Sequence, residues 1–221
     1  MHNIVNNLLS IQNELKIKIK KLNFENYYPN IVAVSKTFTI SDILPLINHG
    51  HLHFGENKVQ ESIEKWTSIK SDFKDIKLHM IGKLQTNKVK YVVRLFDYIH
   101  SVDSLKLAEK ISQEQVKNNK IMKLFIQINI DNENQKYGIL IDQLDKFYNQ
   151  CTNDLGLNVI GLMCLPPNDN KSQIYFSKMK ELVIKLKLKD ISMGMSNDYL
   201  EAINYQSTYL RIGSKIFGER T

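Results

Sequence analysis

Lys36 follows, after Ser35, a run of apolar and mostly β-branched residues, IVAV at positions 31–34. Such a run predicts a buried strand, so the side chain of Lys36 should leave the chain at the end of that strand. Burial lowers the pKa of a lysine amine, and the neutral amine is the form that attacks an aldehyde to make a Schiff base. The alternative is a lysine at the rim of the protein whose amine reaches solvent.

Two segments near the end of the chain combine small residues with hydroxyl groups. Gly194 and Ser196 follow a predicted strand at 190–193, and Gly213 and Ser214 follow another at 208–212. Backbone N–H groups at strand ends of this kind, with helix N-termini behind them, bind phosphate in many barrel proteins. One such segment would be weak evidence, but two at successive strand ends indicate a phosphate site.

Arg211 lies just before the second of these segments. A guanidinium on that strand can point into the same mouth and donate to the nitrogen of an aromatic ring. Enzymes that use pyridoxal 5′-phosphate (PLP) tune the pyridine nitrogen of this cofactor with an aspartate or an arginine. Arginine keeps its proton, so it would leave the ring nitrogen unprotonated and weaken the electron sink. The alternative is a structural arginine paired with a carboxylate.

The elements that must position these residues follow from the residue pattern, which alternates between short apolar runs and amphipathic stretches. Patterns typical of strands lie at 31–35, 51–54, 78–81, 98–101, 122–130, 159–164, 190–193 and 208–212. Helical patterns lie at 1–22, 41–49, 57–69, 86–95, from 103 or 104 onward, 140–151, 172–187 and 198–204. Ser41 or Asp42 is the predicted cap of the helix at 41–49.

Eight strand–helix units predict an α/β protein that forms a single TIM-like (β/α)8 barrel over residues 1–221. The helix at 1–22 precedes the first unit and is expected to pack on the barrel through Ile4, Leu8, Ile11 and Leu15. In such a barrel the carboxyl ends of all strands meet at one face. Lys36, the two phosphate-type segments and Arg211 are therefore expected around one mouth.

The composition limits the classes of partner. The net charge of +7 suggests a polyanion such as nucleic acid, but the lysines are spread along helices in a chain rich in Lys, Asn and Ile, so we expect no nucleic-acid partner. No apolar run reaches the roughly 18 residues of a membrane span, and residues 1–22 do not resemble a signal peptide. The two cysteines, Cys151 and Cys164, form no CxxC pair. A cytoplasmic protein is the simplest interpretation.

His49, His51 and His53 are candidate metal ligands because they lie close together in the sequence. His51 and His53 would share one face of a strand, but neither a carboxylate nor a cysteine cluster completes a site beside them. We expect no metal and interpret them as structural. For His79 we expect a ring nitrogen paired with a backbone group, and a place in the pocket is the alternative.

Seven motifs resemble those of the pyridoxal phosphate homeostasis protein family. They are IVAVSK at 31–36, HFGENKVQE at 53–61, HMIGKLQTNK at 79–88, IHSVDS at 99–104, GLM at 161–163, SMGMSND at 192–198 and RIGSKIFG at 211–218. The resemblance extends from about residue 31 to 220. Leu78 departs from it, since the family usually has an aromatic residue there, and Ser214 stands where threonine is common.

The resemblance implies an alanine-racemase-like barrel of fold type III that binds PLP. It implies that Lys36 forms the Schiff base and that Asn57 lies in the pocket near the cofactor. Ser196, Gly213 and Ser214 match positions that bind the phosphate, and Arg211 matches the residue that faces the pyridine nitrogen. Members of the family act in vitamin B6 homeostasis without established catalysis, and PLP-dependent apo-enzymes are candidate recipients.

A racemase-like enzyme is the alternative. Two-base racemisation needs an acid–base group on each face of the cofactor, and racemases of this fold take the second group from a β-rich domain. The chain ends at Thr221, just after the predicted eighth strand, so we expect that domain to be absent and expect a carrier that is a monomer or weak dimer. Tyr137, in the loop after the fifth strand, stays open as a substitute.

Overall fold

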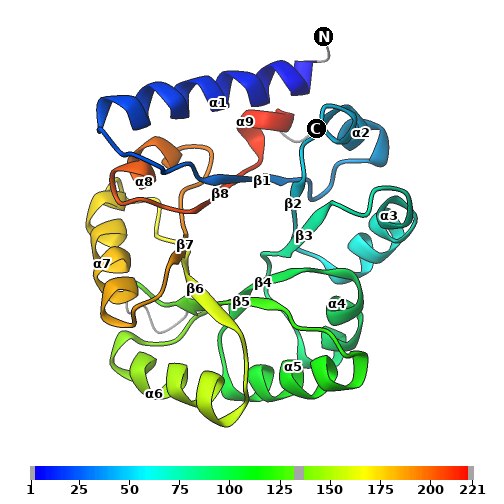
Figure 1. Cartoon of the computed structure of the whole chain (residues 1–221), viewed down its shortest axis with the longest axis vertical. Helices are drawn as coiled ribbons and strands as arrows, with labels where there is room; N and C mark the ends of the chain where they lie inside the picture. Colours follow the sequence, from blue (N-terminus) through cyan, green and yellow to red (C-terminus); the bar gives the residue numbers. More distant parts are fainter. Residues whose placement is uncertain (1–2, 132–136, 219–221) are drawn as a thin grey trace.

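A computed structural model describes residues 3–131 and 137–218 of the chain. Its centre is a closed barrel of eight parallel strands in sequence order, in which β1 pairs with both β2 and β8 (Figure 1). The strands are β1 (Asn30–Val34), β2 (His53–Glu56), β3 (Lys77–Met80), β4 (Tyr98–Val102), β5 (Lys123–Ile128), β6 (Val159–Cys164), β7 (Asp190–Ser192) and β8 (Tyr209–Ile212). The predicted TIM-like (β/α)8 fold is confirmed.

Helices surround the barrel and connect its strands (Figure 1). They are α1 (Asn3–Lys21), α2 (Ile40–Asn48), α3 (Val59–Asp72), α4 (Val89–Leu95), α5 (Leu105–Asn118), α6 (Leu144–Asn149), α7 (Ser172–Lys185), α8 (Tyr199–Asn204) and α9 (Ser214–Phe217). Short 3-10 turns lie at Thr86–Lys88 and Ile141–Gln143, and a π-turn lies at Gln150–Asp154. Within the ranges 3–131 and 137–218, no helix is long and apolar enough to cross a membrane.

Apolar side chains are buried in two places, because successive strand residues point to opposite sides of the sheet. The larger cluster lies between the strands and the helices that cover them. A smaller cluster contains Val32, Tyr98, Phe125, Met163 and Tyr209. Its aromatic rings contact two buried histidines, so this cluster mixes apolar and polar groups.

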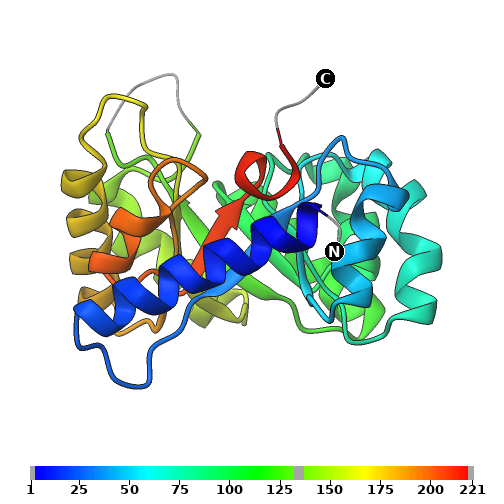
Figure 2. The ribbon, with the colours of Figure 1, turned by 90° about the horizontal axis from the view of Figure 1, so that it is seen from above.

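The N-terminal helix α1 lies across the outside of the barrel, beside α8 and α9 (Figures 1 and 2). Its buried residues recur at helical spacing and are Val5, Leu8, Ile11, Leu15 and Ile19. Asn7 Nδ2 donates to the Ile216 carbonyl oxygen over 2.9 Å. Glu14 accepts hydrogen bonds from the Tyr199 hydroxyl and from Lys215 Nζ, the latter at 3.0 Å. Thus α1 holds the short helix that begins at Ser214.

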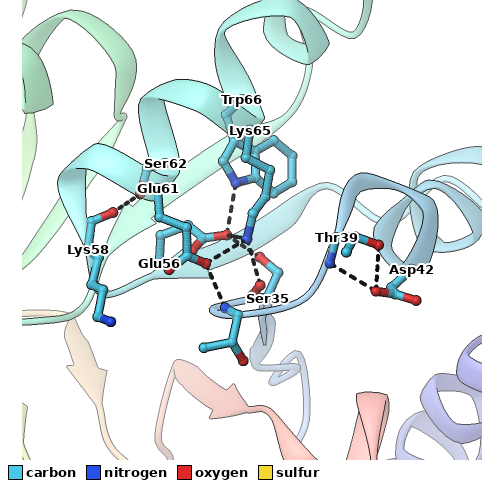
Figure 3. A network of polar contacts seen from close by, with 10 residues as sticks. Ser35, Thr39, Asp42, Glu56, Lys58, Glu61, Ser62, Lys65 and Trp66 are labelled. Carbon is cyan, nitrogen blue, oxygen red and sulfur yellow. Dashed lines mark hydrogen bonds and ion pairs between the residues drawn. The ribbon is translucent and has the colours of Figure 1, made fainter. Parts of the chain in front are cut away.

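Three local predictions were wrong. Helix α2 is capped by Thr39 rather than by Ser41 or Asp42, because the Thr39 N–H reaches the Asp42 carboxylate over 2.9 Å and closes the first turn (Figure 3). His51 precedes β2, and its Nε2 lies 2.9 Å from the His53 carbonyl oxygen. The helix expected at 140–151 is divided into a 3-10 turn, α6 and a π-turn. The wider π-turn lets the buried Cys151 offer its carbonyl oxygen to Leu157 N–H at 2.9 Å.

Candidate functional site

A cavity of about 550 Å³ opens at the carboxyl ends of the strands. This volume lies within the roughly 300–1,000 Å³ usual for small-molecule sites. The structure brings all of the predicted site residues to its wall, namely Lys36, Asn57, Ser196, Arg211, Gly213 and Ser214. The sequence did not single out several others, among them Phe38, Ile81, Leu165 and Met195, which supply apolar surface.

The backbone on both sides of Lys36 is held in place. Ser35 N–H donates to the Gly55 carbonyl oxygen over 3.0 Å, as a continuation of the sheet. Thr37 has a φ of +70°, which is unusual for a β-branched residue. Its N–H donates to Glu61 Oε1 over 2.6 Å. The backbone that carries Lys36 is thus held by β2 before the lysine, at Ser35, and by α3 after it, at Thr37.

Glu56, at the end of β2, is the centre of a buried polar network behind Lys36 (Figure 3). Its Oε1 accepts hydrogen bonds from Ser35 Oγ at 2.8 Å, Trp66 Nε1 at 2.9 Å and Lys65 Nζ at 3.0 Å. Its Oε2 is buried and has no hydrogen-bond partner among the described residues. A carboxylate in this position is costly to bury unless donors surround it.

Lys65 completes the network from α3. Its ammonium contacts three acceptors, which are Glu56 Oε1, Glu61 Oε1 at 3.1 Å and the Ser35 carbonyl oxygen at 2.9 Å. Burial alone would raise the pKa of Glu61, but the Thr37 N–H and the Lys65 ammonium hold it below its ordinary value. A buried ion pair adds little net stability, so its main effect here is to fix the backbone around Lys36.

The two phosphate-type segments meet at the cavity. Ser196 Oγ accepts from the backbone N–H groups of Gly213 and Lys215, at 3.3 and 3.4 Å. A phosphate oxygen is the same kind of acceptor for backbone N–H groups. Gly194 has a φ of +89°, and a Cβ there would lie 2.7 Å from the Ala202 Cβ, so the tight turn before Ser196 requires glycine.

Arg211 is buried at the base of the cavity and contacts two uncharged groups. One guanidinium nitrogen donates to Ser192 Oγ, and the other donates to the Cys164 carbonyl oxygen over 2.8 Å. Burial lowers the pKa of Arg211, although an arginine stays protonated in proteins. Among the described residues no carboxylate forms an ion pair with Arg211: the guanidinium contacts a hydroxyl and a carbonyl oxygen, and the Asp198 carboxylate acts on it only through the longer-range charge interaction.

Asn57 provides the clearest sign that the cavity is built for a ligand. Its Oδ1 is buried and accepts no hydrogen bond from the described residues. Buried polar atoms of this kind are nearly always paired in proteins, so Oδ1 can serve a donor from a bound molecule. Gly82 packs against Asn57 so closely that a Cβ would lie 2.4 Å from the Asn57 carbonyl oxygen. Glycine at 82 is therefore needed to keep Asn57 in the wall.

His79 does not pair with the backbone as predicted. Its Nε2 lies 2.9 Å from His53 Nδ1, and its Nδ1 lies 2.9 Å from His100 Nε2. In the part of the chain that the structure describes, no group of three or more His, Cys, Asp or Glu could hold a metal ion. Periodicity alone placed these histidines on strands but could not show that three strands bring them together.

Residues 14–221 match the family model of the alanine racemase N-terminal domain. A pyridoxal phosphate homeostasis protein of Haemophilus influenzae is 36% identical over 99% of this chain and 96% of the relative. The pyridoxal phosphate homeostasis protein of Escherichia coli K12 is 30% identical over 100% of this chain and 98% of the relative. Both matches extend over nearly the whole length of this chain and of the relative.

Solved structures show the same architecture. PipY of Synechococcus elongatus, determined with PLP bound, superimposes with a TM-score of 0.79 at 30% identity, covering 92% of this chain and 100% of PipY. Alanine racemase of Corynebacterium glutamicum has a TM-score of 0.65 at 14% identity, covering 96% of this chain and 61% of the racemase. At that identity the racemase supports the fold alone.

Proposed function

This chain belongs to the family of pyridoxal phosphate homeostasis proteins, and on this premise we propose that it binds PLP in the mouth cavity as a Schiff base on Lys36. Its role is in intracellular PLP homeostasis, without established catalysis. The observation that carries the proposal is the convergence of Lys36, Asn57, Ser196, Arg211, Gly213 and Ser214 on one cavity, where a buried oxygen of Asn57 has no hydrogen-bond partner among the described residues.

Each residue has a distinct part in this proposal. Lys36 supplies the amine for the covalent link, and the Glu56–Lys65 network holds its backbone. Ser196, Gly213 and Ser214 supply a hydroxyl pair and N–H groups for the phosphate. Asn57 Oδ1 accepts a hydrogen bond from the bound molecule. When bound, PLP supplies an aldehyde and an electron-withdrawing ring.

Arg211 favours binding of PLP without catalytic turnover. A guanidinium N–H of Arg211 donates to the ring nitrogen but keeps its proton. The ring nitrogen therefore stays unprotonated, which weakens the ring as an electron sink. A carrier needs the covalent link without the chemistry that the sink drives. Tyr137 lines an adjoining cavity of about 280 Å³, which shares Leu165 with the mouth cavity, and Lys83 Nζ lies 3.6 Å from its ring centroid.

The remaining parts of the proposal concern setting and partners. We propose a single PLP-binding domain over residues 1–221, a cytoplasmic location, and a monomer or weak dimer that delivers PLP to PLP-dependent apo-enzymes. Cys151 and Cys164 are both unpaired and buried, as suits a reducing compartment. We propose no nucleic-acid or membrane partner, because the excess lysines are spread over the helices.

The visible spectrum of the purified protein tests the proposal. We expect an absorption band of the Schiff base that borohydride removes, leaving PLP covalently attached to Lys36. Lys36→Ala should lose the band, whereas Lys58→Ala, at an exposed lysine outside the cavity wall, should keep it. A protein that stays colourless after addition of PLP would overturn the assignment.

A second assay separates a carrier from an enzyme. The PLP-loaded protein is incubated with a panel of L-amino acids, and the D-products are measured. We expect no sustained turnover. Multiple turnovers that disappear in Lys36→Ala would establish the racemase-like alternative instead.

A further inference from the structure

Five polar side chains form a continuous hydrogen-bonded chain through the interior of the barrel. The links are His53 Nδ1 to His79 Nε2 at 2.9 Å, His79 Nδ1 to His100 Nε2 at 2.9 Å, His100 Nδ1 to Ser192 Oγ at 2.8 Å, and Ser192 Oγ to Arg211. We call this set the histidine chain. Arg211 lines the mouth cavity, and His53 lines a separate cavity of about 270 Å³ beside the amino ends of β1 and β2.

The middle of the histidine chain is enclosed by packed side chains. His79, His100 and Ser192 are fully buried. The His79 ring stacks on Tyr98 with centroids 4.1 Å apart, and the His100 ring stacks on Phe125 with centroids 4.3 Å apart. Burial also lowers the pKa of both histidines well below the ordinary value, so their rings are neutral. Each neutral ring has one donor nitrogen and one acceptor nitrogen.

The direction of every bond in the histidine chain follows from Arg211. A guanidinium only donates, so Ser192 Oγ accepts from it. The one acceptor that the described contacts offer to the Ser192 hydroxyl is His100 Nδ1. His100 then carries its proton on Nε2 and donates to His79, and His79 donates from Nε2 to His53. A positive charge at one end favours this same orientation of the dipoles, with acceptors toward the guanidinium.

We propose that His100 is a positioning residue for Arg211, acting through Ser192. The inference rests on the proposed function, in which Arg211 faces the ring nitrogen of PLP. Ser192 Oγ and the Cys164 carbonyl oxygen accept hydrogen bonds from two nitrogens of the guanidinium. Because the Ser192 hydroxyl donates to His100 Nδ1, its oxygen is oriented to accept from Arg211. The guanidinium therefore presents one fixed edge to the mouth.

If the histidine chain is broken beside Arg211, the guanidinium loses a partner and gains freedom to turn. The ring nitrogen would then meet a less well-placed donor. We expect a shifted absorption band, a changed pH midpoint of that band, and PLP release faster by roughly tenfold, the effect expected for loss of a charge-assisted hydrogen bond.

The protonation pattern can be measured in ligand-free protein. Long-range ¹H–¹⁵N correlation spectra of histidine-labelled protein distinguish the two neutral ring forms. We expect His79 and His100 to carry the proton on Nε2 at neutral pH. A proton on Nδ1 of either ring, or a doubly protonated ring, would overturn the proposal.

Variants test the effect on the cofactor. Ser192→Ala removes the link with little change in volume, and His100→Phe keeps a ring for stacking on Phe125 but cannot hydrogen-bond. Both should show the faster release and the changed band, while His100→Gln, which keeps an acceptor and a donor, should recover most of the parent behaviour. Tyr98→Phe is the matched control, because it removes a hydroxyl from the same interior without cutting the histidine chain.

The outcomes separate this inference from the proposed function. If Ser192→Ala and His100→Phe match the parent in release rate, band and pH midpoint, the histidine chain has only a structural role. If the parent itself binds no PLP, the proposed function fails, and with it the role of His100 toward the cofactor. The spectra of the ligand-free protein would then still decide whether the bonds run away from Arg211.

Discussion

The ammonium of Lys65 lies 2.9 Å from the backbone carbonyl oxygen of Ser35, and Ser35 directly precedes Lys36. The same ammonium contacts Glu56 and Glu61, and Glu61 accepts the N–H of Thr37 on the other side of Lys36 (Figure 3). One buried cation therefore fixes the backbone before and after the lysine that is proposed to hold the cofactor. The placement of Lys36 depends on α3 as well as on β1.

Replacing this cation should damage both the fold and the site. Lys65→Met leaves the buried Glu56 without its ion pair, which should cost about 3–5 kcal/mol of unfolding free energy. At a temperature where the variant is still folded, PLP should react with Lys36 more slowly, because the segment at 35–37 is no longer held. Urea unfolding and stopped-flow absorbance measure the two effects.

Lys185→Met is the matched control. Lys185 also contacts a carboxylate, Asp145 at 2.5 Å, but both side chains are more than half exposed, at 58% and 54%. Exposed pairs contribute less than about 1 kcal/mol. A Lys65→Met protein no less stable than Lys185→Met would contradict the assigned role of Lys65.

Gly82→Ala should distort the cavity wall. The new Cβ would lie 2.4 Å from the Asn57 carbonyl oxygen and 2.7 Å from its Cα, so Asn57 must move. We expect the PLP dissociation constant, measured by equilibrium dialysis, to rise by at least roughly tenfold because Oδ1 leaves its position. Gly156→Ala, at an exposed turn with no atom within 4 Å of the new Cβ, should leave the dissociation constant unchanged.

Acid should destabilise the protein through its buried histidines, beginning below about pH 6.5. Burial lowers the pKa of His51 and of His53 to about 4, against about 6.5 for an unfolded histidine. Between these values the unfolded state binds more protons, so stability falls as pH falls from about 6.5 to about 4. The slope is up to roughly 1.4 kcal/mol per pH unit for each histidine.

Unfolding in urea at several pH values measures this slope. His51→Asn should reduce it, because the buried ring that takes up a proton on unfolding is then absent. A stability that stays constant from pH 7 to pH 4.5 would show that these rings are solvated in the folded protein.

Helix α1 should owe its attachment to apolar burial rather than to its polar contacts. Ile11 is fully buried, so Ile11→Ala should cost about 2–5 kcal/mol. Glu14 and Lys215 are 34% and 39% exposed, so Glu14→Gln should cost less than about 1 kcal/mol. Thermal denaturation followed by circular dichroism ranks the two variants, and the reverse order would refute this account.

The sequence predicted the barrel because each strand and helix has its own local period. The boundaries of β6 at Val159–Cys164 were predicted without error, since that run is apolar from end to end. Thr39 was missed as a cap because its partner Asp42 was itself interpreted as the cap. Local patterns leave such ambiguities, since neighbouring polar residues can exchange roles.

The site was predicted as a set of strand ends, and its supporting groups were not. Lys36 and Arg211 are recognisable because a charge at the end of an apolar run is unusual. Lys65 lies in an ordinary amphipathic helix, and only the packing of α3 on the barrel makes it buried. His100 became significant only through the closure of the barrel, which brings His100 of β4 and Arg211 of β8 to the same hydroxyl group on β7. Contacts between distant strands leave no periodic trace in a sequence.

Helix α1 and helix α9 also impose an order on biosynthesis. Asn7 donates to the carbonyl oxygen of Ile216, 209 residues further along the chain. A ribosome releases the apolar face of α1 long before α8 and α9 exist to cover it. That face must stay uncovered, or be bound by a chaperone, until α8 and α9 have been synthesised. Helix α1 thus docks on α8 and α9 late, and the rim at Ser214 is secured only once α9 has been made.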